Sequence, residues 1–338
     1  MKRSHLVPNL VTYGCLLDAC VKNNEIGRAH NVFNCMLRDK IQLNTVIYTT
    51  MIKAYSKQWQ LDQALELYGR MRSEMKHNPQ VAPNTVTYNS LIDICVRCFN
   101  MPQAQQIFSD MMNGTAVVRP DLITYSTMIK GYCKEKNIEQ ALEMLNTMLK
   151  QNIKADEVLY NSLLDGCCKA NQLDFAFKVY ANMRAANIAA SNVTYSILIK
   201  IYSRQKNHNA ALALLDEMKT YGVKPGLIVY TCLIQTFIAA DMVEKAEDLF
   251  RRMRQEKVRP DAVMYCTLIK GQLRDHRLHE ALNTALKMVQ ENPPAGSRSD
   301  PYNEVLQKIR QTFYGNISAQ KVAQHRCQDL AYVVRCLE

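Results

Sequence analysis

The sequence predicts an all-α fold in which antiparallel helical hairpins stack into an α-solenoid. Two observations predict it. Tyrosine recurs at intervals of 35 residues from Tyr125 to Tyr265, and the two intervals before Tyr125 are 40 and 37 residues. Apolar residues inside each interval recur at steps of three and four, the period of an amphipathic helix. Self-similarity at such a period indicates repeated units that bury their apolar faces only against their neighbours.

Conserving one register through the chain defines eight repeats. We number each repeat so that the recurring tyrosine is its fourth residue, and we call each position a place. The tyrosines at place 4 are Tyr13, Tyr48, Tyr88, Tyr125, Tyr160, Tyr195, Tyr230 and Tyr265. Place 20 is alanine in all eight repeats: Ala29, Ala64, Ala104, Ala141, Ala176, Ala211, Ala246 and Ala281. Place 27 is methionine in all eight: Met36, Met71, Met111, Met148, Met183, Met218, Met253 and Met288. Alanine lets two helices approach closely, and methionine fills irregular gaps between them.

This register divides the chain in order. Residues 1–9 are the tail of a preceding repeat or the start of the chain. The eight repeats are 10–44, 45–84, 85–121, 122–156, 157–191, 192–226, 227–261 and 262–298. Residues 299–338 are predicted to form a degenerate repeat and a C-terminal helical cap. The extra residues of repeats 2 and 3 fall after place 27 and predict lengthened turns rather than broken helices. Asp, Asn or Ser at the end of most repeats predicts an N-cap for the next helix.

Composition sets broad limits on function. The 338 residues are 48% hydrophobic and 22% charged, so the chain can bury a core. No apolar run is long enough to span a bilayer, and the first residues lack the apolar stretch of a signal peptide. Most of the twelve cysteines fall inside predicted helices, which favours reduced thiols over disulfides. The net charge of +11 favours a polyanionic partner.

The repeat resembles that of the P-type pentatricopeptide repeat family, with its V-T-Y-N-x-L-I opening, central alanine, late methionine and Pro-Asp close. The resemblance covers roughly residues 10–298. Tetratricopeptide repeats are the nearest alternative, but their Trp and Leu-Gly signature is missing. The resemblance implies a right-handed superhelix that binds single-stranded RNA, one base per repeat. It further implies a monomer without cofactor or membrane contact that acts on RNA processing, stability or translation in a mitochondrion or plastid.

In the family, the base is read by place 5 and by the last residue of the repeat, which we label place 35. The base-reading residues carried over to this chain are Thr49, Asn84, Asn89, Asp121, Ser126, Asp156, Asn161, Ser191, Ser196, Thr231 and Asp261. A branched aliphatic residue at place 2 sandwiches the bases, here Val46, Val86, Ile123, Val158, Val193, Ile228 and Val263, with Val11 in repeat 1. Repeats 2–7 then predict the target 5′-A-U-G-C-R-G-3′, R being a purine. Gly14 with Asn44 in repeat 1, Ser196 with Gly226 in repeat 6, and Cys266 in repeat 8 depart from the family's pattern, so their bases stay open or weakly discriminated.

Charged residues continue the same helical face. Place 13 is basic in seven of eight repeats, and we predict that it binds phosphates: Lys22, Lys57, Arg97, Lys134, Lys169, Arg204 and Arg274. Places 5, 9 and 13 are four residues apart and lie on one face of a helix. Place 9 alternates largely between Asp and Lys, which predicts pairing between adjacent hairpins. Two simpler interpretations remain open: cations are favourable near helix C-termini, and place 35 serves only as a cap.

Enzyme motifs are not found, so we predict that the chain is not an enzyme and holds no metal. The stretch CVRC at Cys95–Cys98 is a lone C-x-x-C without a second pair to complete a zinc site. In HRLHEAL, from His276, the residue Asn283 stands where a metalloprotease motif needs histidine. The alternative function is a protein-binding scaffold that uses the same surface for a peptide. Variation at place 5 beside a constant aliphatic place 2 favours RNA.

Overall fold

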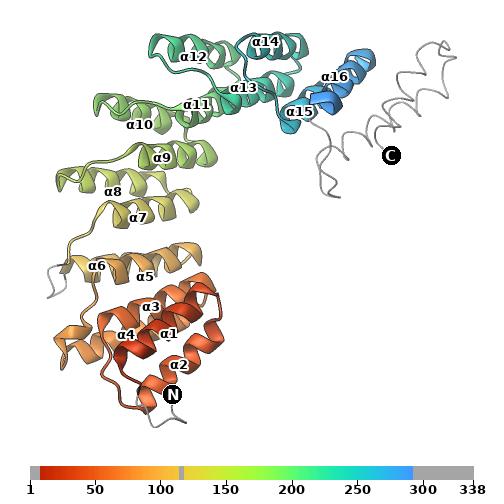
Figure 1. The fold of residues 1–338 in the computed structure, drawn as a ribbon. Helices are drawn as coiled ribbons and strands as arrows, with labels where there is room; N and C mark the ends of the chain where they lie inside the picture. Colours follow the sequence, from red (N-terminus) through yellow and green to blue (C-terminus); the bar gives the residue numbers. More distant parts are fainter. Residues whose placement is uncertain (1–7, 114–117, 292–338) are drawn as a thin grey trace. The chain divides into compact units, whose positions relative to one another are not determined.

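The computed structural model describes residues 8–113 and 118–291 of the chain, and Figure 1 shows its helices. Within these residues the chain forms sixteen α-helices and one 3-10 helix, η2. They fall into two compact units, Met1–Ile188 and Ala189–Glu338, which we describe separately as the N-terminal and C-terminal units. A helix long and apolar enough to cross a membrane is absent from the described part. The predicted cap over 299–338 lies outside the described residues.

Each repeat is a pair of helices joined by a short turn. The first helices begin at place 1: α1 (Leu10–Lys22), α3 (Thr45–Lys57), α5 (Thr85–Arg97), α7 (Leu122–Lys134), α9 (Glu157–Ala170), α11 (Asn192–Arg204), α13 (Leu227–Ala239) and α15 (Ala262–Arg274). The second helices begin at place 17: α2 (Ile26–Arg38), α4 (Leu61–Met75), α6 (Met101–Asn113), α8 (Ile138–Lys150), α10 (Leu173–Ala185), α12 (His208–Thr220), α14 (Val243–Gln255) and α16 (Leu278–Glu291). The all-α prediction is confirmed.

The last residue of each repeat sets the start of the next first helix. Its side chain accepts a hydrogen bond from a backbone N–H of the first turn at Asn9, Asn44, Asn84, Asp121, Asp156, Ser191 and Asp261. These bonds satisfy N–H groups that a helix start leaves without a partner. Gly226 has no side chain and provides no such cap for α13. The predicted capping is therefore confirmed at every described repeat boundary except this one.

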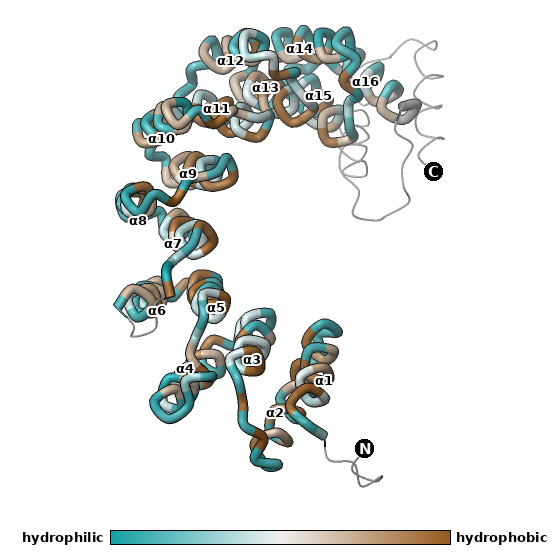
Figure 2. The backbone as a smooth tube through the Cα atoms, turned by 60° about the vertical axis from the view of Figure 1, so that its left-hand side comes forward, coloured by the Kyte–Doolittle hydropathy of each residue, from teal (hydrophilic) through white to brown (hydrophobic). Residues whose placement is uncertain are grey.

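The first helices form the core of each unit. In the N-terminal unit, α1, α3, α5, α7 and α9 pack in series, and each second helix packs on its own first helix. Helices α2, α4, α6 and α8 also pack on the next first helix. In the C-terminal unit, α11, α13 and α15 pack in the same way. Figure 2 shows the consequence in α13, which is largely hydrophobic, and α14, which is largely hydrophilic. The tyrosines at place 4, alanines at place 20 and methionines at place 27 are all buried, at most 7% exposed.

The extra residues of repeat 2 are partly helical. Helix α4 continues to Met75, and η2 (Pro79–Val81) follows, with Val81 fully buried. The Thr45 hydroxyl lies 2.9 and 2.8 Å from the carbonyl oxygens of Gln80 and Ala82, and so ties this segment to α3. The prediction of a simple lengthened turn is wrong here, because burial of Val81 and these bonds favour an ordered 3-10 turn. The corresponding stretch of repeat 3 includes residues 114–117, which lie outside the described residues.

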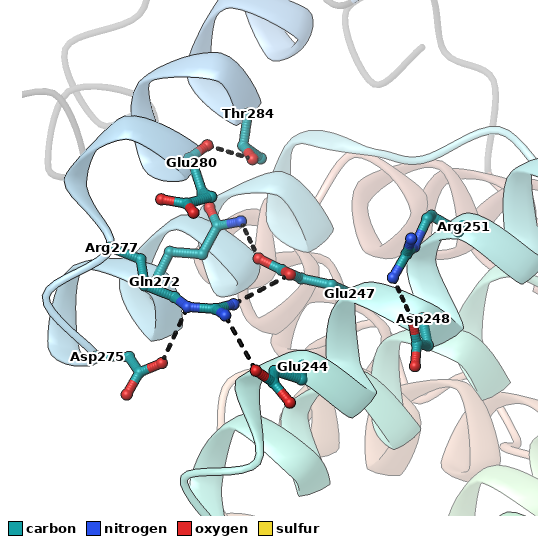
Figure 3. A network of polar contacts seen from close by, with 9 residues as sticks. All are labelled: Glu244, Glu247, Asp248, Arg251, Gln272, Asp275, Arg277, Glu280 and Thr284. Atoms are coloured by element: carbon teal, nitrogen blue, oxygen red, sulfur yellow. Dashed lines mark hydrogen bonds and ion pairs between the residues drawn. The ribbon is translucent and has the colours of Figure 1, made fainter.

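A polar network joins repeats 7 and 8 within the C-terminal unit (Figure 3). The Arg277 guanidinium lies 3.2 Å from both Glu244 and Glu247 of α14 and 3.4 Å from Asp275. The amide of Gln272, which is 2% exposed, donates to Glu247 at 2.7 Å. The network therefore fixes the turn between α15 and α16 against α14, and it supplies a charged partner to a buried amide.

The tyrosine at place 4 has an acidic partner at place 30 in several repeats. Tyr48 donates to Glu74 at 2.6 Å, and Tyr230 donates to Glu256 at 2.7 Å. Burial, helped by the nearby Glu74 carboxylate, raises the pKa of Tyr48 above its ordinary value. The Tyr125 hydroxyl is also buried but has no hydrogen-bond partner among the described residues. Place 30 of its repeat is an amide rather than an acid.

We therefore expect Gln151→Glu to stabilise the N-terminal unit by about 0.5–1.5 kcal/mol, because a carboxylate at place 30 is a stronger, charged acceptor and accepts from the tyrosine in repeats 2 and 7. Urea unfolding followed by circular dichroism near neutral pH measures the gain. The variant Tyr125→Phe removes the hydroxyl, so adding Gln151→Glu to it should change nothing. An equal gain in both backgrounds would show that the carboxylate acts through another group.

Candidate nucleic-acid interface

The packing leaves one strip of each first helix uncovered. Place 2 is valine or isoleucine in all eight repeats, yet it is 46–69% exposed: Val11, Val46, Val86, Ile123, Val158, Val193, Ile228 and Val263. Places 9 and 13 lie on the same face and are exposed or half-exposed in every repeat. Folding normally gains free energy by burying such aliphatic side chains. A repeated row of exposed ones indicates a contact surface.

In repeat 3 the structure brings the two predicted reading residues together. The Asn89 amide nitrogen Nδ2 donates to Asp121 Oδ1 at 3.1 Å, and the Thr124 hydroxyl lies 2.6 Å from Asn89 Oδ1 and 2.9 Å from Asp121 Oδ1. Burial alone would raise the pKa of the Asp121 carboxyl, but hydrogen bonds from the Thr124 amide, Asn89 and the Thr124 hydroxyl outweigh it and lower that pKa. Asp121 therefore remains an ionised acceptor that holds Asn89 in place.

In repeat 2 the reading residues are linked through a third side chain. The hydroxyls of Thr49 and Thr87 are 2.7 Å apart, and Thr87 Oγ1 lies 2.9 Å from Asn84 Oδ1. Thr49 is only 7% exposed, so a small part of it faces the surface. Thr87 occupies place 3 of the following repeat, as Thr124 does one repeat later.

Two other reading pairs lie in repeats 4 and 5. Ser126 is half-exposed, and Asp156 caps α9 without a hydrogen bond to Ser126 within the described residues. The Asn161 amide donates to Glu157 of its own helix at 3.1 Å. Ser191 caps α11, where Thr194 completes a capping box. Each of these residues is therefore placed by local helix geometry.

The C-terminal unit departs further from the predicted pattern. Ser196 is 4% exposed and donates to the Val193 carbonyl at 2.7 Å, and Gly226 offers no side chain beside it. Thr231 donates to the Leu227 carbonyl of its own helix at 2.8 Å, while Asp261 caps α15. Cys266 at place 5 of repeat 8 is also buried, at 4% exposed. Repeats 6 and 8 thus present little polar surface at place 5.

The acidic residues at place 9 pair inside their own helices. Distances between side-chain N and O atoms are 2.7 Å for Lys22–Asp18, 2.9 Å for Arg97–Asp93 and 2.6 Å for Lys169–Asp165. The prediction that these aspartates pair with lysines of the adjacent hairpin is therefore wrong. The physical reason is the spacing of four residues, which brings places 9 and 13 within reach along one helix. Such exposed pairs contribute little stability.

Other cations at place 13 contact the preceding repeat. Lys57 Nζ donates to the Val21 carbonyl at 3.2 Å, and Arg274 donates to the Ile238 carbonyl. Both carbonyls lie in the last turn of a first helix. The interpretation that cations are favourable near helix C-termini therefore applies to these two residues. Lys134 is exposed, lies 5.8 Å from the centre of the Phe99 ring, and has no carboxylate partner among the described residues. The positive charge of the row is therefore compensated in some repeats and free in others.

The cysteines and acidic residues form no metal site in the described part. Its ten cysteines are free thiols, and no three His, Cys, Asp or Glu residues there are placed to hold a metal ion. Burial raises the pKa of the thiols of Cys95, Cys133 and Cys167 to about 12. These thiols are therefore protonated near neutral pH and unreactive. This agrees with a packing role for the CVRC stretch.

Sequence reasoning missed the threonine at place 3. Thr87, Thr124 and Thr194 are fully buried, and each bonds to the residue at place 35 of the preceding repeat. The signal was present in the sequence, because a hydroxyl recurs at a place that other repeats fill with Ile, Leu, Val or Met. Its partners lie in another repeat and become visible only in the packed structure.

Comparison with known proteins finds a matching family model and several relatives. A family model described as the pentacotripeptide-repeat region of PRORP matches residues 9–174 and 168–293. A chloroplastic pentatricopeptide repeat-containing protein of Arabidopsis thaliana is 33% identical over 142 residues, which is 42% of this chain and 26% of that protein. The mitochondrial 15S rRNA processing factor CCM1 of Yarrowia lipolytica is 26% identical over 146 residues, 43% of this chain and 19% of that protein. The matches thus span about a quarter or less of these relatives.

Solved structures show the same fold. The pentatricopeptide repeat protein PPR10 in complex with an 18-nucleotide psaJ RNA element aligns with a TM-score of 0.71 and 20% identity, over 97% of this chain and 47% of that chain. A second structure, of PPR10 from maize, aligns with a TM-score of 0.50 and 21% identity, over all of this chain and 56% of that chain. At this identity the likeness concerns the fold.

Proposed function

The chain belongs to the pentatricopeptide repeat family, and from this premise we propose that it is a sequence-specific single-stranded RNA-binding protein that reads about one base per repeat. Relatives named as chloroplastic proteins and as a mitochondrial rRNA processing factor support work on organellar RNA, in its processing, stability or translation. The proposal contains no catalytic step, because occupying a transcript is sufficient for these roles.

The exposed row at place 2 is the observation that carries this proposal. Eight branched aliphatic side chains are exposed at the same place of successive repeats, and repeats 2–5 and 7 also have polar residues at places 5 and 35. Unstacked RNA bases have apolar faces and polar edges, so they need an apolar surface against the face and donors or acceptors at the edge. Repeats 2–5 and 7 supply both. A peptide groove has no need for a new polar side chain at every repeat beside the same aliphatic one.

Charge supports the same ligand. The net charge of the chain is +11, and place 13 adds a cation to the exposed strip in seven repeats. Lys134 is exposed and has no carboxylate partner among the described residues, so we propose it as a strong phosphate contact. Lys22, Arg97 and Lys169 are each paired with an aspartate, and we expect smaller contributions from them.

Binding to an RNA that contains AUGCAG tests the proposal. We expect the protein to bind it about tenfold or more tightly than a scrambled RNA of the same composition, because good base contacts discriminate by about 1–3 kcal/mol each. The logarithm of affinity should fall linearly with the logarithm of salt, with a slope of about −0.7 per phosphate contact. Fluorescence anisotropy across a salt series measures both. Equal binding to both RNAs would contradict base reading, and no binding to either would favour a protein partner.

A further inference from the structure

The threonine at place 3 is buried where the fold does not require a hydroxyl. Thr87 and Thr124 are 0% exposed, and both follow a repeat whose reading residues are linked by hydrogen bonds. Four other repeats bury an apolar residue at this place: Ile47, Leu159, Val229 and Met264. An apolar side chain therefore packs here without loss of the fold. Burying a hydroxyl is favourable only where it is hydrogen-bonded, so the bonds of the two threonines are their distinguishing property.

In repeat 3 these bonds determine which way the Asn89 amide points. A carboxylate only accepts, so Asp121 Oδ1, 3.1 Å away, takes a proton from Asn89 Nδ2. This turns Asn89 Oδ1 toward the Thr124 hydroxyl, which lies 2.6 Å away and donates to it. The amide is then held at both ends. One Nδ2 proton is used by Asp121, and the second proton is the donor left for a ligand.

In repeat 2 a similar set of hydrogen bonds leaves an acceptor, rather than a donor, for a ligand. The Thr87 amide N–H donates to Asn84 Oδ1 at 2.9 Å, which turns that oxygen toward Thr87. The single proton of the Thr87 hydroxyl is assigned to Asn84 Oδ1, also 2.9 Å away. With this assignment Thr49, 2.7 Å from Thr87, donates its own proton to Thr87. What Thr49 retains for a ligand is its oxygen lone pairs.

We propose that the buried threonine at place 3 is a specificity-determining residue, whose hydroxyl acts with the residue at place 35 to hold the reading residue of the preceding repeat, so that it offers a fixed donor or acceptor to an RNA base. The inference rests on the proposed function and deepens it. A donor at Asn89 suits the O4 acceptor of uracil and rejects the N4 amino group of cytosine. An acceptor at Thr49 suits the N6 amino group of adenine and rejects the O6 acceptor of guanine. The lowered pKa of Asp121 agrees with this, since an ionised carboxylate keeps the amide from turning over.

The test compares RNAs containing AUGCAG and ACGCAG, which differ at the base under repeat 3. In Thr124→Val the side chain keeps its shape but loses its hydroxyl, so Asn89 Oδ1 loses its donor and the amide is held at one end only. We expect the ratio of uracil to cytosine affinities to fall by about three- to tenfold, the worth of one hydrogen bond. Thr124→Ser keeps a hydroxyl and should retain most of the wild-type ratio. Thr12→Val is the matched control, because Thr12 also occupies place 3 but bonds only to the cap Asn9.

A second arm applies the same test to repeat 2. Thr87→Val should lower the ratio of affinities for AUGCAG and GUGCAG while leaving the uracil-to-cytosine ratio unchanged. Fluorescence anisotropy at one fixed salt concentration gives all the affinities. The ratio is the informative readout, because a variant that merely folds less well binds every RNA less.

The outcomes separate the two levels of inference. If the wild type prefers AUGCAG to ACGCAG and Thr124→Val keeps that preference, the role of threonine is overturned and the proposed function stands. A Thr124→Val variant that loses affinity equally for both RNAs overturns it as well, since that behaviour is purely structural. A wild type that treats all these RNAs alike overturns the proposed register and this inference together.

Discussion

Replacing Ser126 with asparagine is expected to move the preference of repeat 4 from guanine to uracil, by about tenfold or more for each base. The variant sets an asparagine against Asp156, which reproduces the Asn89–Asp121 pair that lies 3.1 Å apart one repeat earlier. Ser126 is half-exposed, so the larger side chain has room at the surface. Anisotropy with four RNAs that differ only at the third base of AUGCAG measures the change.

Ser90→Asn is the matched control for this switch. Ser90 lies at place 6 of repeat 3, one residue from a reading place, and its hydroxyl bonds to the Val86 carbonyl of its own helix at 2.7 Å. Its replacement should leave every base preference unchanged. Repeat 5 has Leu159 at place 3, so the asparagine introduced by Ser126→Asn lacks the threonine contact. Uniform weakening for all four bases would refute the assignment of Ser126 as a reading residue.

Gly166→Ala is expected to destabilise the N-terminal unit by about 1–3 kcal/mol, the usual cost of overpacking a core. Gly166 lies on α9 where it crosses α7, and an added Cβ would lie 2.5 Å from Cys133 Sγ and 2.7 Å from Cys133 Cβ. The Cβ of Cys133 is fixed by its backbone and cannot move aside. Only a shift of the two helices can relieve the contact, so the loss should appear in urea unfolding followed by circular dichroism.

Gly69→Ala, the same change at another glycine, is expected to raise stability rather than lower it. Gly69 lies inside α4, and nothing is found within 4 Å of the position of its added Cβ. Alanine should therefore stabilise this helix by about 0.5–1 kcal/mol, the difference in helix propensity. Adding Cys133→Ala to Gly166→Ala should restore only part of the loss, because the Cβ contact remains. If both glycine variants were stabilised, the close approach of α7 and α9 would be refuted.

Much of the fold follows from the repeat pattern alone. The recurrence of apolar residues at steps of three and four predicts where the helices lie. A polar residue at place 35 explains the start of most first helices through its bond to a backbone N–H. Alanine at place 20 and methionine at place 27 are buried in every repeat as the pattern predicts. These features are predictable because each depends on residues within one helix or on a contact that recurs identically eight times.

The surface was less predictable than the core. The charged residues at places 9 and 13 could form ion pairs either between adjacent hairpins or along one helix. The sequence does not give the distances between side chains that distinguish these two possibilities. Asp93 pairs with Arg97 of the same helix at 2.9 Å. Lys57 instead reaches the Val21 carbonyl of the preceding repeat. Such choices depend on the separation of neighbouring helices, which packing determines.

The sequence by itself determined the repeat, its helices and its core, because these depend on periodicity and on residue type. Only the tertiary structure decided how the candidate reading residues are held. Asn89, Asp121 and Thr124 are separated by up to 35 residues in the chain, yet they share one set of hydrogen bonds. Hydrogen bonds need atoms about 3 Å apart in defined directions, and that geometry exists only once one hairpin packs against the next.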